Sequence, residues 1–331
     1  MEPIGEQPPL EVEVRRGGCV ESRHRVRFAV ARSDGAIVRS GGDIRAPVFP
    51  RSAIKPLQAV PLVESGAADR FGLGEVELAL ACASHSGQPE HVSAVGSWLS
   101  KIGCSADDLQ CGAHLPYDEE SAHRLIQAGE RPGALHNNCS GKHAGMLALA
   151  RHLGAPLRGY VEPDHPVQRA VAEVLQSFCD QPQLPAPGID GCGVPTWPVP
   201  LGGLAIAAAR IASPAGLPDA RRDAVRRLVA AMRSHPNLVA GERRPCTRIM
   251  RALPEVVVKT GAEGVYFAAL PARRLGLALK VEDGATRAAV AALMHLLRLV
   301  GVDLPDRLQD LATPVLTNRA GAPVGEIAVR S

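Results

Sequence analysis

The sequence predicts a mixed α/β fold, of the α+β kind, in which one sheet is built from strands at both ends of the chain. Three observations predict it: strand patterns within residues 10–50, further strands within 254–331, and mainly helical patterns within 74–235. The 331 residues contain neither an internal repeat nor a low-complexity linker. We therefore expect a single domain over residues 1–331, whose mixed sheet carries a large inserted helical subdomain.

The first strands are indicated near the N-terminus. Residues 11–14 alternate charged and apolar side chains, and residues 25–32 are followed by Ser33-Asp-Gly35, a composition typical of turns. Ser52 is a good helix cap, and Pro56 suits a first helical turn, where its missing N–H costs little. A helix is therefore expected to begin near Ser52.

Helical periodicity dominates the middle of the chain. It predicts helices near residues 74–83, 89–101, 119–128, 141–153, 163–178, 201–212 and 217–234. Two of the connecting loops, 136–142 and 188–195, are unusually polar and rich in glycine. Strand patterns return at 254–260, 264–270 and 275–281, followed by a long helix near 284–301 and a short strand near 326–330.

Composition argues against several classes of function. The net charge of +3 comes from scattered Arg, and aromatic residues make up only 3%, so nucleic-acid binding is not expected. No stretch approaches the ~20 apolar residues of a membrane helix. Residues 1–10 lack the basic start and apolar run of a secretory signal. We expect a cytoplasmic protein with neither nucleic-acid nor membrane partners.

The eight cysteines are read as free thiols or metal ligands. Their even number would permit disulfides, but a long chain without an export signal favours reduced thiols. Cys82 and Cys179 have apolar or helical neighbours and are predicted to be buried. Cys139 and Cys192 lie in glycine-rich turns, a different setting.

Lysine is scarce in this chain. Only five of the 37 basic residues are Lys, so Arg supplies most of the solvated positive charge. A position that keeps Lys can need an amine that loses its proton, although chance clustering would give the same count. Lys55, Lys142 and Lys259 lie in short stretches rich in Ser, Gly or Cys. Lys101 is expected at the surface, and the sequence assigns no role to Lys280.

Ser52-x-x-Lys55 is the first candidate catalytic pair. A spacing of three at a helix start places hydroxyl and amine on one face, where an unprotonated Lys can act as base for the Ser. So short a pattern also occurs by chance. Support comes from Lys259-Thr-Gly261 after an apolar strand, because this order of motifs is that of penicillin-recognising enzymes. The two motifs in this order predict a Ser/Lys amidohydrolase. The alternative for Lys259 is a cation at the end of a strand, facing water.

Two further stretches can add polar groups to this site. Cys82-Ala-Ser-His-Ser-Gly87 could supply a second hydroxyl from Ser84 and a donor or base from His85, or could simply be a glycine-capped helix end. His136-Asn-Asn-Cys-Ser-Gly-Lys-His143 precedes an apolar helix, whose first N–H groups could bind a carboxylate.

A zinc site is the third candidate. Cys139 and Cys192 could ligate Zn²⁺ together with Lys142, His143 or Asp190. The two cysteines are 53 residues apart, which is not a recognisable zinc spacing. A tightly turned structural loop is the alternative.

Taken together, these stretches resemble the asparaginase II family, the rhizobial-type or class 3 L-asparaginases. The matching pieces are Val20-Glu-Ser-Arg-His24, Arg51-Ser-Ala-Ile-Lys-Pro-Leu-Gln-Ala59, Cys82-Ala-Ser-His-Ser-Gly87, His136-Asn-Asn-Cys-Ser-Gly-Lys-His143, Gly188-Ile-Asp-Gly-Cys-Gly-Val-Pro195, Cys246-Thr and Lys259-Thr-Gly-Ala-Glu-Gly264. They span roughly residues 20–283, and their order is far more specific than any one of them. The family is similar in fold to serine β-lactamases and bacterial glutaminases.

The resemblance implies the composition of the site. It implies two Ser–Lys tandems, namely Ser52 with Lys55 and Ser84 with Lys259. It implies a zinc ion, aiding substrate affinity rather than forming the nucleophile, that is bound by Cys139, Lys142 and Cys192. The residues expected to contact substrate are Ser22, His24, His85, Asn138, Asp190 and Cys246. A homodimer is also implied.

The resulting hypothesis is hydrolysis of L-asparagine to L-aspartate and ammonia through an acyl-enzyme. Ser52 is favoured over Ser84 as the nucleophile, with Lys55 as its base and the backbone N–H of Ser52 as an oxyanion donor. Ser84 and Lys259 then relay protons to the departing ammonia or activate the deacylating water. A glutaminase remains an alternative, as does a penicillin-recognising hydrolase, although no Ser-x-Asn or Tyr-x-Asn element is convincingly placed. The alternative outside enzymes is a non-catalytic zinc or amino-acid binding protein.

Overall fold

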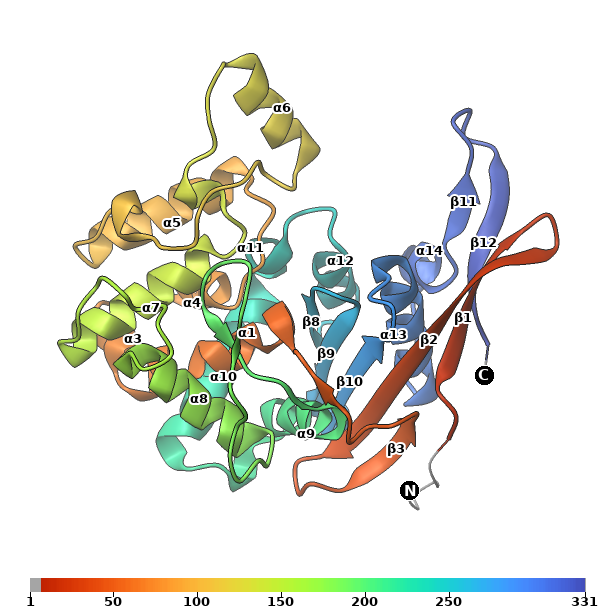
Figure 1. The fold of residues 1–331 in the computed structure, drawn as a ribbon, viewed down its shortest axis with the longest axis horizontal. Coiled ribbons are helices and arrows are strands. Elements are labelled where there is room, and N and C mark those ends of the chain that lie inside the picture. The colour runs from red at the N-terminus through yellow and green to blue at the C-terminus, as the bar shows by residue number, and fades with distance from the viewer. Residues whose placement is uncertain (1–6, 331) are drawn as a thin grey trace. The chain divides into compact units, whose positions relative to one another are not determined.

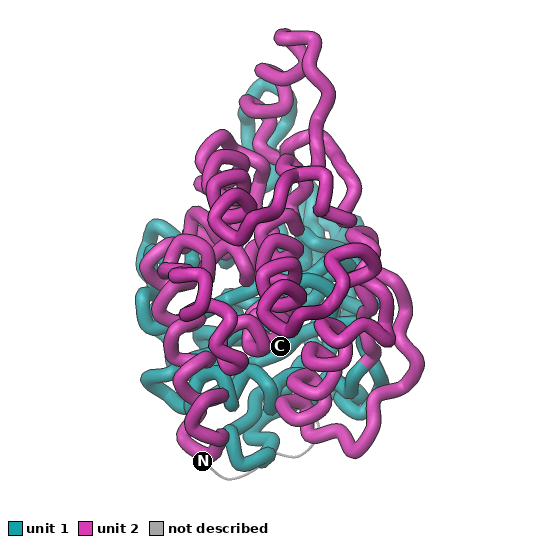
Figure 2. Tube along the Cα trace, turned by 90° about the vertical axis from the view of Figure 1, so that its left-hand side faces the viewer, with its two compact units in different colours: residues 1–53, 199–213, 248–331 teal, residues 54–198, 214–247 magenta. Residues whose placement is uncertain are grey.

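A computed structural model describes residues 7–330, which form two compact units (Figures 1 and 2). Unit 1 comprises residues 1–53, 199–213 and 248–331, and unit 2 comprises 54–198 and 214–247. Residues 1–6, on which part of the prediction about a secretory signal falls, lie outside the described chain. Helices and strands are both abundant, so the predicted mixed fold class is confirmed.

Unit 1 is organised around an eight-stranded antiparallel sheet. The strands follow the order β11-β12-β1-β2-β10-β9-β8, and β3 pairs with β2. Their bounds are β1 Leu10–Arg16, β2 Cys19–Arg32, β3 Ile37–Gly41, β8 Val257–Gly261, β9 Val265–Leu270, β10 Leu275–Val281, β11 Val315–Thr317 and β12 Pro323–Arg330. N-terminal β2 pairs directly with C-terminal β10, so the predicted sheet from both ends of the chain is confirmed.

Helices pack on this sheet through apolar faces. α9 (Leu201–Ala212) lies against β10, β2 and β9, and α13 (Thr286–Leu299) contacts β10, β12 and β1. At Gly276 of β10 the approach of α9 is so close that a Cβ would lie 1.9 Å from the backbone nitrogen of Ala209. Unit 1 also contains α14 (Gln309–Ala312) and a two-stranded ribbon of β4 (Pro47–Val48) and β7 (Val199–Pro200), while α12 (Pro245–Ala252) spans the boundary between the units. The helix at 201–212 thus belongs to the sheet unit.

Unit 2 is helical and has α7 (Ser140–Leu153) near its centre. This helix contacts α2, α3, α4, α5 and α8, and its first three turns are buried. The other helices are α1 Lys55–Gln58, α2 Val60–Glu64, α3 Ala67–Arg70, α4 Glu75–Ala81, α5 Pro89–Lys101, α6 Glu119–Gln127, α8 Pro166–Phe178, α10 Asp219–Ser234 and α11 Pro236–Ala240. A short ribbon of β5 (Gly188–Ile189) and β6 (Pro195–Thr196) carries the Cys192 turn.

Predicted and observed elements differ most around Ser52. The expected helix start is instead a tight 3₁₀ turn, Arg51–Ile54, which Arg51 enters with φ of +51°, and α1 follows it. Ser52 therefore does not cap α1, because the capping position belongs to Ile54. The sequence reasoning also missed α2, α3 and β11, since elements of three to five residues are too short to show a period.

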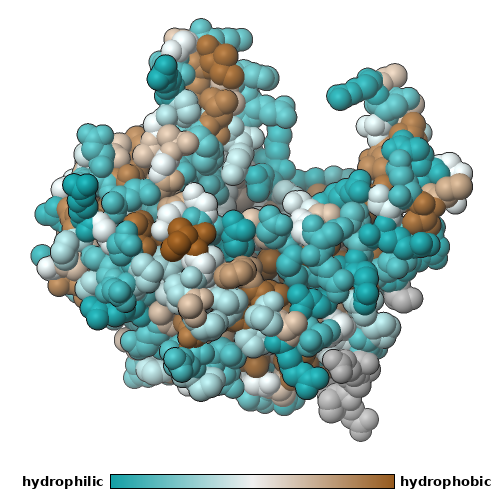
Figure 3. Space-filling view, in the orientation of Figure 1, coloured by the Kyte–Doolittle hydropathy of each residue, from teal (hydrophilic) through white to brown (hydrophobic). Residues whose placement is uncertain are grey.

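The surface is predominantly polar, with apolar side chains gathered over α6 and over the β11–β12 hairpin (Figure 3). Ile126 of α6 and Val315 of β11 are the exposed large apolar residues there. Across residues 7–330, no helix has the length and the apolar content needed to cross a membrane.

Candidate active site

Lys55 and Ser84 form a buried hydrogen-bonded pair within unit 2. Lys55, the first residue of α1, is only 1% exposed, and its Nζ donates to Ser84 Oγ at 2.9 Å. The same Nζ donates to the carbonyl of Ala83 and to Cys139 Sγ, the latter at 3.1 Å. Three acceptors match the three N–H bonds of an ammonium group. The sequence predicts Ser52 as the partner of Lys55 and Lys259 as the partner of Ser84, so the Lys55–Ser84 contact lies outside the predicted pairs.

The loop after α4 holds Ser84 in place by its backbone. Ser84 N donates to the carbonyl of Val239 at 2.9 Å, and His85 N donates to that of Asn138 at 3.1 Å. These bonds attach the loop to two separate segments of unit 2. Ser84 is therefore presented to Lys55 by a fixed backbone.

His85 stabilises this loop with both ring nitrogens. Nδ1 accepts from Gly87 N at 3.2 Å, so Nε2 carries the proton and donates to Ser140 Oγ at 2.8 Å. Burial, and to a smaller extent the nearby ring of His91, lowers the pKa of His85 well below its usual value, which keeps the ring neutral. The arrangement indicates that His85 positions Ser84; contact with substrate remains a prediction.

Two thiols and an amine meet beside this pair. Lys142 of α7 donates from Nζ to Cys192 Sγ at 3.0 Å, and Cys192 hydrogen-bonds to Cys139. That bond from Cys192, helped by the charges of Lys55 and Lys142, lowers the pKa of Cys139. Burial lowers the pKa of Lys142, but the two sulfurs outweigh burial and raise it overall.

The donor set of this cluster fits zinc. Two cysteine sulfurs and a lysine nitrogen are soft and borderline ligands of the kind Zn²⁺ accepts, and all three are buried. Among the described residues, no group of three or more His, Cys, Asp or Glu side chains could hold a metal, and Lys142 as a third ligand stays a prediction. His143, the other candidate, instead engages Nδ1 with the Tyr160 hydroxyl at 2.7 Å.

Asp190 and Asn138 lie on loops around the cluster. Asp190 sits at the β5–β6 turn, half-buried, with Oδ1 accepting from Gly191 N at 2.8 Å. Asn138 precedes Cys139, and its backbone N donates to His114 Nε2 at 3.0 Å. The eight cysteines, all within residues 7–330, form no disulfide, and Cys82 and Cys179 are buried, as the sequence predicted.

Ser52 and Lys259 belong to unit 1. Lys259 on β8 is only 1% exposed, so the alternative of a strand-end cation facing water is wrong. The edge of β8 lies against the turn that carries Ser52: a Cβ at Gly261 would come within 2.6 Å of Pro50 O and 3.2 Å of Ala53 N. Only glycine permits this approach, which explains the Gly of the Lys-Thr-Gly motif.

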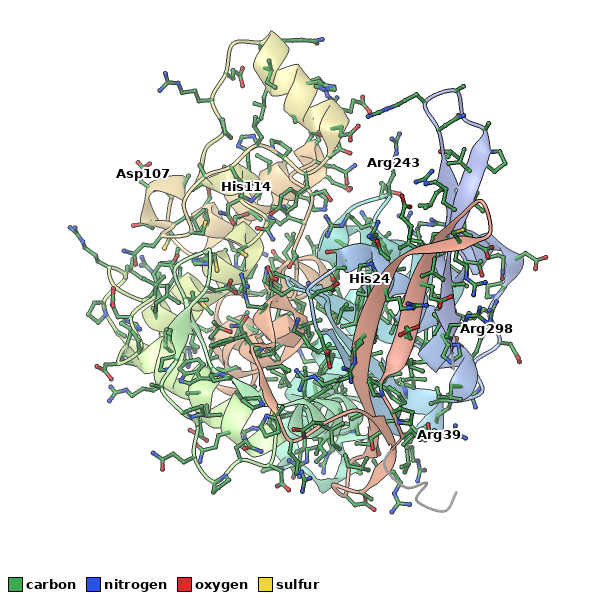
Figure 4. The ribbon with its side chains drawn as sticks, turned by 45° about the vertical axis from the view of Figure 1, so that its right-hand side comes forward. His24, Arg39, Asp107, His114, Arg243 and Arg298 are labelled. Carbon is green, nitrogen blue, oxygen red and sulfur yellow. The ribbon has the colours of Figure 1, made fainter. Side chains whose placement is uncertain are left out.

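The remaining predicted substrate residues lie on β2 and α12. His24 is on β2 (Figure 4), where its Nδ1 contacts Asp283 Oδ2 at 2.6 Å and its Nε2 accepts from Arg287 Nε at 3.2 Å. Ser22 is two residues earlier on the same strand, and Cys246 is buried in α12. Asp283 was missed; its only sequence signal is the turn Glu282-Asp-Gly284 after a strand.

Comparison with solved structures gives only distant likenesses. A β-lactamase from Mycobacterium bovis is 15% identical, with 83% of this chain and 94% of that one covered and a TM-score of 0.43. A β-lactamase from Sphaerobacter thermophilus has the same identity and TM-score, with 85% and 94% covered. The protein called Mglu is 17% identical, with 85% and 68% covered and a TM-score of 0.39. Likenesses this weak carry no argument about function.

A comparison with curated proteins found no relative. A family model, in contrast, matches nearly the whole chain: that of L-asparaginase II, over residues 12–329. The match includes every motif from the Ser52 turn to the Lys-Thr-Gly strand and supports a hydrolase acting on amides. The chain therefore belongs to the L-asparaginase II family.

Proposed function

We propose that this protein hydrolyses L-asparagine to L-aspartate and ammonia through an acyl-enzyme. The observation that carries the proposal is the buried Lys55–Ser84 hydrogen bond, because a lysine amine bonded to a hydroxyl can take a proton from a reacting serine and pass it on without a histidine. Membership of the L-asparaginase II family supports amide hydrolysis.

In the proposed mechanism Ser52 attacks the side-chain amide carbon of asparagine and Lys55 accepts its proton. The tetrahedral intermediate expels ammonia, which takes up a proton relayed through Ser84 and Lys259, and water then releases aspartate. Only the neutral amine of Lys55 can act as the base. The proton that it takes from Ser52 can then pass to Ser84, whose Oγ is hydrogen-bonded to the amine.

Zinc has a separate place in the proposal. Cys139, Lys142 and Cys192 would hold the ion, which would supply a positive charge that helps to retain the substrate. To serve as a ligand, Lys142 must be neutral, so metal uptake releases its proton. We further predict that the protein is a homodimer and is located in the cytoplasm.

The decisive experiment is ammonia release from asparagine by Ser52→Ala, Ser84→Ala and Lys55→Met. We expect each to lower kcat by about 10³-fold or more, because each removes a group that acts in the transition state. Lys101→Met is the matched control, since Lys101 is at the surface and pairs with Glu77. Turnover of Ser52→Ala near that of the unmodified protein, with loss in Ser84→Ala, would make Ser84 the nucleophile.

The same assay separates the alternative functions. Ammonia from glutamine in preference to asparagine would indicate a glutaminase. Hydrolysis of a chromogenic cephalosporin without ammonia release would indicate a penicillin-recognising enzyme. A thermal shift with asparagine and zinc but no product would indicate a binding protein, and would contradict the proposed reaction.

A further inference from the structure

Lys280 binds backbone carbonyl groups on two turns of unit 1. It is the sixth residue of β10 and is half-buried. Its Nζ donates to the carbonyl of Glu263 at 2.7 Å and to that of Val281. Glu263 belongs to the turn between β8 and β9, and Val281 ends β10. One amine thus links the two turns.

The turn between β8 and β9 has an unfavourable backbone. Glu263 has φ of +59° and Gly264 has φ of +67°, and the first of these is a region that side chains other than Gly, Asn and Asp rarely adopt. Such a conformation persists only where neighbouring groups hold it, and it is often found next to a functional site. Besides Lys280, the turn is held by the bond from Val281 N to Gly264 O at 3.0 Å.

The second turn is anchored firmly to the sheet. Glu282 N donates to the carbonyl of Arg25 on β2 at 2.9 Å. Asp283 accepts from Ala285 N at 3.0 Å and contacts His24 on β2 at 2.6 Å. Lys280 therefore connects a strained turn to a well-anchored one.

The strained turn lies directly beyond the candidate catalytic strand. Lys259 pairs with Phe267, and Gly261 pairs with Val265, so the turn sets the register at this end of β8. Gly261 lies against Pro50 and Ala53, the turn that carries Ser52. A shift in the β8–β9 turn would therefore move Lys259 and Thr260 relative to Ser52.

We propose that Lys280 is a positioning residue, whose two carbonyl contacts hold the β8–β9 turn and so keep the Lys259-Thr260-Gly261 edge in the conformation that binds substrate. The inference rests on the proposed function and deepens it. Arg is a poorer choice here, because a planar guanidinium matches carboxylates better than two converging carbonyls. This requirement accounts for a fourth lysine in a chain that otherwise prefers Arg.

The first test is steady-state asparagine hydrolysis by Lys280→Met, which keeps the apolar stem but has no donor. We expect KM to rise by about fivefold or more and kcat to change by less than about twofold, because binding contacts rather than reacting groups are disturbed. Lys280→Arg should recover part of the loss, and Lys101→Met should leave both constants unchanged. Lys280→Leu, which likewise has no donor, replaces Lys280→Met if the latter does not fold.

A second substitution tests the strain itself. Asn tolerates positive φ better than Glu, so Glu263→Asn added to Lys280→Met should bring KM back toward the unmodified value. Hydrogen exchange supplies a readout that does not need activity: amides 262–264 should exchange faster in Lys280→Met than in the unmodified protein.

Two results would overturn the proposal. One is unchanged KM and unchanged exchange at 262–264 in Lys280→Met. The other is a loss of active protein in proportion to a lower Tm, with KM unaltered, which would make Lys280 a general stabiliser. If the unmodified protein released no ammonia, the proposed function would fail, while exchange at 262–264 would still decide whether Lys280 holds the turn.

Discussion

Single residues decide the chemistry of the candidate site, and its lysines have distinct partners. Lys55 contacts a serine and a thiol, at 2.9 and 3.1 Å, whereas Lys142 contacts a thiol at 3.0 Å. Lys259 is as deeply buried as Lys55 but donates to the neighbouring carbonyl of Thr260. Burial is costly for an ammonium group, which makes these three positions candidates for a chemical role.

The proposed zinc ligands give the first prediction. Cys192→Ser should weaken zinc binding by about 100-fold or more, because a hydroxyl is a much poorer zinc ligand than a thiolate. Competition with a chromogenic chelator measures the affinity directly. Cys104→Ser is the matched control, as Cys104 is a partly exposed thiol. Equal zinc affinity in Cys192→Ser and the unmodified protein would contradict the assignment of Cys192.

At the scale of secondary-structure elements, close backbone approach determines where glycine is required. The contact of α9 with β10 brings Ala205 O and Ala209 N to the position that a Cβ on Gly276 would occupy. α7 and α4 meet similarly, since a Cβ on Gly141 would lie 2.4 Å from Leu80 O. These contacts set the spacing between α9 and the sheet, and between α7, which carries Cys139 and Lys142, and α4.

Gly276→Ala should therefore destabilise the protein. The added methyl group collides with backbone atoms that cannot move independently, so we expect a loss of about 1–3 kcal/mol or more in the free energy of unfolding. Urea denaturation measures this change. Gly133→Ala provides the comparison, since a Cβ there meets nothing within 4 Å. Equal stability of the two variants would mean that α9 can shift away from β10.

At the scale of the whole molecule, long-range pairing and buried histidines set the stability. The centre of the sheet joins Val26 of β2 to Val281 of β10, so both ends of the chain are needed before it can form. In unit 2, the rings of His85 and His91 stack with centroids 4.9 Å apart. Two cations stacked in a buried place would repel, so the fold depends on their neutrality.

This dependence predicts how stability changes with pH. Burial is the main cause that lowers the pKa of both His85 and His91 below 6.5. Below about pH 6.5 the unfolded chain therefore binds protons that the folded chain does not, and the free energy of unfolding falls as the pH drops. Above that pH the two histidines are neutral in both the folded and the unfolded chain, so the free energy of unfolding keeps its full value. The expected slope is about 1.4 kcal/mol per pH unit for each histidine.

Urea denaturation at about pH 7.5 and 5.5 tests the prediction. His85→Asn should reduce the difference between the two free energies by about 1 kcal/mol or more. The exposed His123→Gln serves as the control and should preserve the difference. An identical pH dependence in His85→Asn would show that His85 does not contribute to it.

The sequence was sufficient for local structure and for the types of residue in the site. The helices at 89–101 and 201–212 and the strand at 275–281 have the predicted bounds, because their periods extend over seven residues or more. The motifs around Ser52, Ser84, Cys139 and Lys259 identified the family, which the match over residues 12–329 confirms. The spacing of residues within a motif or a helix is a local property, so it can be read directly from the sequence.

Partners that are distant in the chain could not be read in this way. The contact of Lys55 with Ser84, the link from Lys280 to the Glu263 turn and the contact of His24 with Asp283 each join segments that only tertiary packing brings together. The 3₁₀ turn Arg51–Ile54, in place of a helix start capped by Ser52, could not be predicted either, and the edge of β8 lies against this turn at Gly261. By itself the sequence determined the family and which lysines and serines are candidates for the site. The folded structure decided which groups each of them contacts, because the partners of a side chain are set by contacts across the fold and not by its neighbours in the chain.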